Sequence, residues 1–199
     1  MPEQEILFLV FSYLVGSIPF GYLIFYVTDR KDIRTVGSLN IGATNVLRSK
    51  GKLAGLLTLA LDIAKGALPV LYAKNHFDSP ALVIAGGAAV VLGHVFPVFL
   101  KFHGGKGVGA FVGVLLAYDI PALLVFLIVF LGIVILTRFV SLGSVVGTGA
   151  VFFVILFTRI AEVSAIFFLM TLLIIIRHRS NIGRLLDGSE RKINLRKNG

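Results

Sequence analysis

The sequence contains no cysteine and no tryptophan, and only 10 of its 199 residues are acidic. Without cysteine the chain forms no disulfide, offers no thiolate to a metal and has no cysteine nucleophile. The GxSxG motif of many serine acyl-transfer enzymes does not occur either. HExxH, paired carboxylates and an EF-hand loop are also missing. We therefore expect no metal and no cofactor.

Apolar residues are what the sequence has in excess, at 57% of the chain, compared with about 45–50% in soluble domains. A helix needs roughly 20 mainly apolar residues to cross a bilayer. The chain is predicted to be one integral membrane domain over 1–199, with a basic cytoplasmic tail from about 177. No signal peptide is expected, because residues 1–5 are acidic and lack Lys or Arg. The predicted spans are 4–27, 53–73, 81–100, 107–118, 121–137, 141–158 and 160–176.

The span 107–118 is short, because 12 residues at about 1.5 Å each cannot cross a core roughly 30 Å thick. Merging it with the next span would give one helix over 107–137 and six spans. Charge favours seven, since 16 of the 19 Lys and Arg then lie on one side, as the positive-inside rule requires. Asp119 and Pro121 also break the helical pattern. We predict an all-α membrane protein with seven transmembrane helices, the N-terminus outside and the C-terminus cytoplasmic.

A glycine-rich loop, "KFHGGKGVGAF" at 101–111, precedes the short span. A re-entrant loop below the membrane surface would explain the length of that span, if protein or water surrounds it. The loop is no Walker motif, because position 100 is leucine and no Ser or Thr follows the lysine. Its glycine amides, the following helix N-terminus and one ammonium suit an anion. A tight turn between helices explains the pattern equally well. The candidate residues are Gly104, Gly105, Lys106 and Gly107.

A second polar segment, "RTVGSLNIGATNVLRSKG", covers 34–51. A solvated loop would explain one or two of these residues. The density of amides, hydroxyls and arginines favours a binding site, in which arginine grips phosphate bidentately. The neutral candidates are Ser38, Asn40, Thr44 and Asn45, and the cationic ones are Arg34 and Arg48.

A third polar segment, "RHRSNIGRLLDG", follows the last span at 177–188. His178 and Asn181 are three residues apart and would share one helix face. Snorkelling anchors explain the arginines. The imidazole points to chemistry, because histidine exchanges protons near neutral pH. Ser141, at the cytoplasmic start of the sixth span, is either a helix-packing residue or a phosphate donor.

Two ionisable residues, Asp62 and Lys65, lie inside the second span. Charges at this depth are expensive, and the i, i+3 spacing lets the two residues pair. We expect a structural brace for the pocket. His94 is expected to be a structural hydrogen-bonding residue. Together with His103 it offers too few ligands for zinc.

Three basic, glycine-bearing segments beside lipid indicate a site for anions and an acyl chain. Direct transfer between two phosphate-bearing substrates needs only clamps and oxyanion donors. A transporter of phosphorylated solutes would also need a basic pocket at broken helices, but no repeated half occurs. A scaffold that binds lipid headgroups is the other alternative. Nucleic acid is not expected, because the cations are tethered at a bilayer face.

The segments "GSIPFGYLI", "VGSLNIGATNVLR", "GHVFPVFLKFHGGKGV" and "RHRSNIGRLLDGSE" together resemble the bacterial acyl-phosphate:glycerol-3-phosphate acyltransferase family, from Gly16 to about Lys192. The resemblance implies a seven-helix enzyme of the bacterial inner membrane with its active site facing the cytoplasm. It implies transfer of a fatty acyl group from acyl phosphate to the sn-1 hydroxyl of glycerol 3-phosphate. The products are lysophosphatidic acid and phosphate, in the first acylation step of phospholipid synthesis. No acyl-CoA, acyl-carrier protein or metal is implied, and we take a monomer as the working state.

The resemblance also implies roles for individual residues. The glycine loop would bind glycerol 3-phosphate, and the donor's own phosphate would accept the hydroxyl proton. Glu190 would be structural. The implied catalytic residues are Ser38, His178 and Asn181. The implied substrate-binding residues are Asn40, Asn45, Arg48, Gly104, Gly105, Lys106, Gly107 and Ser141.

Overall fold

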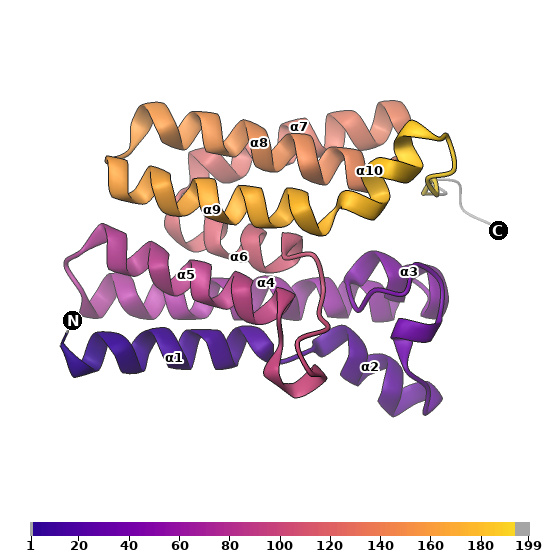
Figure 1. Cartoon of the computed structure of the whole chain (residues 1–199), viewed down its shortest axis with the longest axis horizontal. Helices are drawn as coiled ribbons and strands as arrows, with labels where there is room; N and C mark the ends of the chain where they lie inside the picture. The colour runs from indigo at the N-terminus through magenta and orange to yellow at the C-terminus, as the bar shows by residue number, and fades with distance from the viewer. Residues whose placement is uncertain (1, 194–199) are drawn as a thin grey trace. The chain divides into compact units, whose positions relative to one another are not determined.

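The structure, a computed structural model, describes residues 2–193, so the last part of the expected basic tail (194–199) lies outside the described residues. Every regular element within 2–193 is a helix, which confirms the all-helical prediction (Figure 1). The chain divides into two compact units, unit 1 (Met1–Asp119) and unit 2 (Ile120–Gly199).

Both units consist of helices that follow the apolar runs of the sequence, with shorter helices between or after them. Unit 1 contains α1 (Glu3–Ser17), α2 (Phe20–Asp29), η1 (Ile33–Thr35), α3 (Ala43–Lys50), α4 (Lys52–His76), α5 (Pro80–Val95), η2 (Val98–Leu100) and α6 (Val108–Tyr118). Unit 2 contains α7 (Ile120–Thr137), α8 (Val140–Thr158), α9 (Ala161–Arg177) and α10 (Arg179–Leu186).

The first predicted span is divided into α1 and α2 at Ile18 and Pro19. Ile18 has extended backbone (φ −63°, ψ 115°), because a following proline disfavours the helical conformation. The Ile18 carbonyl accepts a hydrogen bond from the Lys65 ammonium of α4, with an N–O distance of 2.8 Å. The break therefore gives a lysine within the second span a main-chain partner.

Among the described residues, five stretches are long and apolar enough to cross a membrane, with α1 and α2 taken together as one. A sixth results if α9 and α10, which meet at a bend of 55°, count as one span. The helix α6 has 11 residues, about 16 Å by helical rise. It ends at Asp119, which has extended backbone, so the merged helix over 107–137 does not form. The count of seven spans and the orientation of the termini stay predictions.

The helices α4 and α6 approach each other closely enough for their backbones to touch. A Cβ atom added to Gly66 would lie 2.1 Å from the Ala110 carbonyl oxygen, and one added to Gly113 would lie 2.0 Å from the Ile63 oxygen. Such glycines let apolar helices associate in lipid through close packing. The short α6 is thus attached to the long α4 along its length.

The pair α1 and α5 makes the same kind of contact, and Figure 1 draws both beside α4. A Cβ atom added to Gly16 would lie 2.2 Å from the Val90 oxygen, and one added to Gly93 would lie 2.2 Å from the Tyr13 oxygen. Unit 1 therefore contains two helix–helix contacts, α4 with α6 and α1 with α5, in which the backbones touch. These two contacts are the seams of unit 1.

In unit 2, α8 packs against both α7 and α9. Its small residues face α7, where a Cβ atom at Gly143 would lie 2.9 Å from the Phe130 oxygen. Large apolar side chains point outward, including Leu136 at 85% exposure and Phe157 at 83%. Apolar surface of this extent is stable against hydrocarbon and not against water.

Candidate active site

The second polar segment (34–51) begins in η1, where Arg34 is held by Asp32. The Asp32 carboxylate accepts from the Arg34 backbone N–H at 2.8 Å and from its Nε and Nη2 at 3.0 and 2.7 Å. The other terminal nitrogen, Nη1, lies 3.5 Å from the Leu100 carbonyl at the end of η2. Arg34 thus braces the segment against the approach to the glycine loop. The phosphate contacts predicted for Arg34 and Arg48 stay predictions.

Asn45, in the first turn of α3, organises the rest of the segment. Its amide nitrogen donates to the carbonyls of Val36 (2.9 Å) and Asn40 (2.8 Å), and its amide oxygen accepts from the Ser38 N–H (2.8 Å). The side chain is buried, with the residue 2% exposed. These contacts assign Asn45 the task of holding the turn that carries Ser38. The direct substrate contact predicted for Asn45 stays a prediction.

The turn that Asn45 holds contains an unusual backbone conformation. Leu39 has φ +58° and is 64% exposed, although a left-handed conformation costs a branched residue roughly 1–2 kcal/mol. The Asn40 amide oxygen accepts from the Gly42 N–H at 2.9 Å and closes the turn before α3. The local hydrogen bonds thus fix a backbone that leucine would not adopt by itself.

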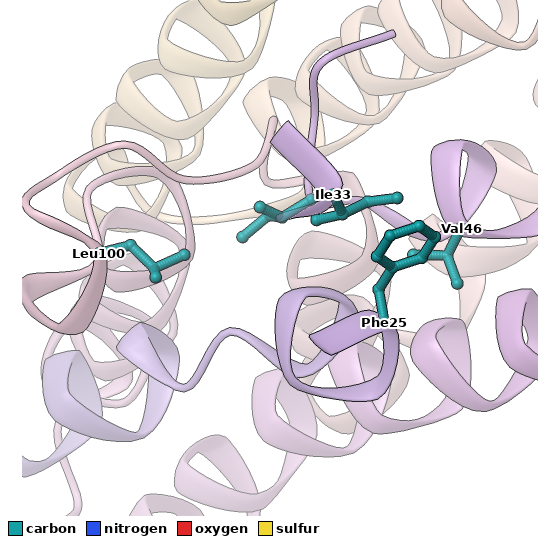
Figure 2. Close-up of a cluster of buried hydrophobic side chains, with 5 residues drawn as sticks. Phe25, Ile33, Val46 and Leu100 are labelled. Carbon is teal, nitrogen blue, oxygen red and sulfur yellow. The ribbon is translucent and has the colours of Figure 1, made fainter. Parts of the chain in front are cut away.

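An apolar cluster joins this segment to the glycine loop (Figure 2). Phe25 of α2, Ile33 of η1 and Val46 of α3 pack with Leu100 of η2, and all are buried. Ile41 completes the cluster. The second polar segment and the residue that precedes the glycine loop are therefore parts of one packed region of unit 1.

The glycine loop itself is packed tightly against the end of α5. The Gly105 N–H donates to the His94 carbonyl at 3.0 Å. A Cβ atom at Gly104 would lie 2.3 Å from that carbonyl oxygen, and one at Gly105 would lie 2.1 Å from the His94 Nε2. Gly107 has φ +90° and begins α6. These glycines are thus required by close packing, and the Gly105 amide already has a protein partner.

Lys106 lies between these glycines, immediately before the N-terminus of α6. The first N–H groups of a helix have no carbonyl partner within it and carry a partial positive charge. An ammonium beside such a terminus favours an anion. The anion site predicted from the sequence stays a prediction, and the N-terminus of α6 is the helix terminus next to it.

Asp62 and Lys65 of α4 form the ion pair expected from their spacing, with an N–O distance of 2.8 Å. The His94 Nδ1 lies 3.5 Å from the same Asp62 oxygen. All three residues are 3% exposed. The approach of His94 to the pair was not predicted, because this contact links two different helices, α4 and α5.

In unit 2, His178 stands at the junction of α9 and α10. Its Nδ1 lies 2.8 Å from the Ile174 carbonyl, and a carbonyl only accepts, so Nδ1 carries the proton. In the neutral ring Nε2 is then the unprotonated nitrogen. His178 is 2% exposed and Asn181 is 4% exposed, and the Asn181 N–H donates to the His178 carbonyl at 2.8 Å. The structure thus brings the two predicted residues together in a buried turn.

Glu190 ties three side chains of unit 2 together. Its Oε1 accepts from the Ser141 hydroxyl and from the Asn181 amide, each at 2.7 Å, and its Oε2 accepts from the Arg184 Nε at 2.8 Å. The Glu190 side chain is only 6% exposed. Two residues predicted to touch substrate, Ser141 and Asn181, are therefore oriented by one carboxylate. Their substrate contacts stay predictions.

The pKa of Glu190 responds to two opposing influences. Burial raises it, but the hydrogen bonds from Ser141, Asn181 and Arg184 outweigh burial and lower the pKa below the ordinary 4.5. A carboxylate whose folded pKa is lowered stabilises the fold above its unfolded pKa, and this contribution is lost as the pH falls through the lowered value. The ionised form of Glu190 is thus part of the native state.

The thermal stability of the purified protein should therefore decrease on acidification from about pH 6 to about pH 3. The Glu190→Gln variant, which has no charge to lose at this position, should show a smaller decrease. The measurement is the Tm in detergent at each pH for both proteins. Equal slopes for the two would contradict the assignment.

A family model described as "Glycerol-3-phosphate acyltransferase" matches residues 6–188. A relative of that name from Mesorhizobium japonicum is 43% identical over 188 residues, which cover 94% of this chain and 95% of the relative. Another, from Thermotoga petrophila, is 41% identical over 189 residues, with 95% and 96% covered.

The fold is also similar to that of solved proteins. A crystal structure of PlsY (YgiH), described as an integral membrane glycerol 3-phosphate acyltransferase in its glycerol 3-phosphate form, matches with a TM-score of 0.92 and 41% identity. Its lysophosphatidic acid form matches with a TM-score of 0.88 and 39% identity. Each match covers 96% of both chains. The likeness therefore extends over nearly all the segments that carry the candidate residues.

Proposed function

Because the chain belongs to the glycerol-3-phosphate acyltransferase family of integral membrane enzymes, we propose that it moves a fatty acyl group from acyl phosphate to the sn-1 hydroxyl of glycerol 3-phosphate. The products are lysophosphatidic acid and inorganic phosphate. The observation that carries the proposal is the likeness, over 96% of both chains, to a structure described as the glycerol 3-phosphate form of such an enzyme. The motif resemblance noted in the sequence is confirmed by the same comparisons.

The donor accounts for the lack of a serine or cysteine nucleophile motif. An acyl phosphate is a mixed anhydride and is already activated, so no covalent acyl-enzyme is needed. The substrate hydroxyl forms a new bond to the acyl carbon, the bond from that carbon to the phosphate oxygen breaks, and the departing phosphate takes the hydroxyl proton. The protein's task is to hold the two anions together and to stabilise the developing oxyanion.

Unit 1 supplies the groups that offset the charge of the two phosphates. We assign the glycerol 3-phosphate headgroup to Lys106 and to the N-terminus of α6, which begins two residues later at Val108. Arg48, in the last turn of α3, is the second clamp. Ser38 lies in the turn held by Asn45 and contributes a hydroxyl to the reacting groups. Coulombic interactions of this kind are stronger in a partly desolvated pocket than in water.

Unit 2 supplies the polar groups for the transition state. With Nδ1 bound to the Ile174 carbonyl, the neutral His178 ring offers Nε2 as an acceptor for the attacking hydroxyl. Glu190 orients the Asn181 amide and accepts the one proton of the Ser141 hydroxyl, and we assign Asn181 to the phosphate or the oxyanion. We propose that the reaction takes place at the cytoplasmic face of the bacterial inner membrane. The concentration of 16 of the 19 Lys and Arg in the segments assigned to that face supports this location.

A direct assay tests the function. Detergent-purified protein is mixed with palmitoyl phosphate and glycerol 3-phosphate, and phosphate and lysophosphatidic acid are quantified. We expect the two products in equal amounts. A transporter or a headgroup-binding scaffold would give no turnover without a sealed compartment.

The same reagents test for an acyl-enzyme. With labelled palmitoyl phosphate alone, the proposal expects neither a burst of phosphate nor label on the protein. Stoichiometric label that glycerol 3-phosphate then removes would replace direct transfer with a two-step mechanism.

Replacing His178 with alanine should lower kcat by roughly 100-fold, the range for loss of a group that assists proton transfer, with a smaller rise in the KM for glycerol 3-phosphate. The reason is that the ring is assigned to the attacking hydroxyl and not to the phosphate. Steady-state kinetics in both substrates checks it. A change in KM alone would move His178 from the transition state to ground-state binding.

A further inference from the structure

We propose that His94 is a positioning residue for the glycerol 3-phosphate site, which fixes the backbone of the glycine loop and is itself oriented by the buried Asp62–Lys65 pair. The inference rests on the proposed function, because it takes the loop at Gly104–Gly107 as the phosphate site. It assigns a role to a buried histidine that has no part in the transfer mechanism derived above.

His94 contacts the glycine loop in two ways. Its carbonyl accepts the Gly105 N–H at 3.0 Å. The Nε2 edge of its ring faces the same residue, since a Cβ atom at Gly105 would lie 2.1 Å from that nitrogen. Main chain and side chain of one residue therefore set the position of the loop just before Lys106.

The opposite edge of the ring faces a fixed charge. The Nδ1 atom lies 3.5 Å from Asp62 Oδ1, an ion-pair distance and longer than a good hydrogen bond. Lys65 holds the same oxygen at 2.8 Å and also donates to the Ile18 carbonyl at the break between α1 and α2. The orientation of the ring is thus anchored to two other elements of unit 1.

Asp62 also reaches the far side of the loop. A Cβ atom at Gly109, in the first turn of α6, would lie 3.0 Å from the Asp62 Cβ. The Asp62 side chain therefore packs through its Cβ against Gly109, and through His94 it acts on Gly105. Lys106 lies between these two supported points.

The energetics argue against simple packing as the reason for these residues. An apolar set of similar volume would be as stable as a buried ion pair, or more stable, and would avoid the cost of desolvation. Sites that bind with precision need residues whose own conformations are locked by a second layer of contacts. Asp62, Lys65 and His94 link α4, α5 and the glycine loop, and they supply this second layer of contacts.

The test compares His94→Ala and His94→Gln with a matched control, Thr58→Val. Thr58 is buried in α4, one turn before Asp62, and donates to the Ala54 carbonyl within its own helix. In His94→Ala we expect the KM for glycerol 3-phosphate to rise by about 10-fold or more, because small misplacements of a binding group are costly. The KM for palmitoyl phosphate and the kcat should change by less than about threefold. Gln, which keeps a polar group near Asp62, should restore part of the affinity.

A second measurement does not depend on turnover. Glycerol 3-phosphate should raise the Tm of the wild type and of Thr58→Val, and this shift should shrink in His94→Ala. An unchanged KM and an unchanged ligand-induced shift would overturn the inference. Failure of both His94 variants to fold, seen as loss of the monodisperse peak in gel filtration, would overturn it too and assign His94 to stability. A wild-type protein without turnover would refute the proposed function instead, and with it this inference.

Discussion

Replacing Lys106 with alanine should reduce acyl transfer by at least about 100-fold, and replacing Arg48 with alanine should have a comparable effect. Both proposed substrates carry a phosphate group. When either cation is removed, the repulsion between the two phosphates is no longer offset. Loss of one donor to a developing oxyanion costs other enzymes about 100- to 1,000-fold in kcat, which sets the scale. The measurement is phosphate release by purified variants in detergent.

The matched control for Lys106 is Lys101→Ala, which removes the same charge from an exposed position in the same loop. This variant should keep turnover within about twofold, because surface charges are screened. Lys106→Arg should recover little, because the guanidinium fork has a different shape from the compact ammonium. Near-normal turnover in both Lys106→Ala and Arg48→Ala would refute the clamp assignment.

Replacing Glu190 with glutamine should destabilise the protein by about 2–4 kcal/mol, since it breaks a largely buried ion pair and one or more charge-assisted hydrogen bonds. The expected fall in Tm is about 5–10 °C for a chain of this size. Turnover should fall as well, because the acceptor shared by Ser141 and Asn181 loses its charge and the new amide NH2 cannot accept from Arg184. Thermal unfolding and kinetics in the same detergent measure both effects.

Asp187→Asn is the control for Glu190→Gln. Asp187 is exposed and lies three residues away, and its carboxylate accepts hydrogen bonds from the N–H and the hydroxyl of Ser189. Asp187→Asn removes one negative charge from the same segment, as Glu190→Gln does, but from an exposed position. The Tm of this variant should therefore stay within about 2 °C of the wild type. A Tm of Glu190→Gln equal to that of Asp187→Asn would show that the Glu190 network does not hold unit 2 together.

The helices were predictable because lipid imposes simple rules on sequence. Long apolar runs and one-sided cations located the helical stretches, and Asp119 marked the end of α6 as expected. The division of the first span at Pro19 was missed, although a proline inside an apolar run is the signal for it. The apolar run is long enough to be predicted as one span, so the helix break that Pro19 causes was not predicted.

The motifs pointed to candidate residues but not to the protein groups with which these residues interact. The motifs singled out Asn45, Ser141 and Asn181 as substrate contacts, whereas the structure shows each in hydrogen bonds that hold neighbouring protein groups. Asp62 and Lys65 paired as their spacing suggested. The nearness of His94 depends on how α5 packs against α4, and no spacing within one helix encodes it.

The two seams of unit 1 constrain the path of the acyl chain of the proposed donor. Where α4 meets α6 and α1 meets α5, there is no room for even one added carbon atom at the four glycines, Gly16, Gly66, Gly93 and Gly113. A hydrocarbon tail is as thick as a chain of such carbons, so it cannot thread through either crossing unless the helices part. Under the proposed function, the acyl donor therefore enters, and the lipid product leaves, by a route that avoids these two helix contacts.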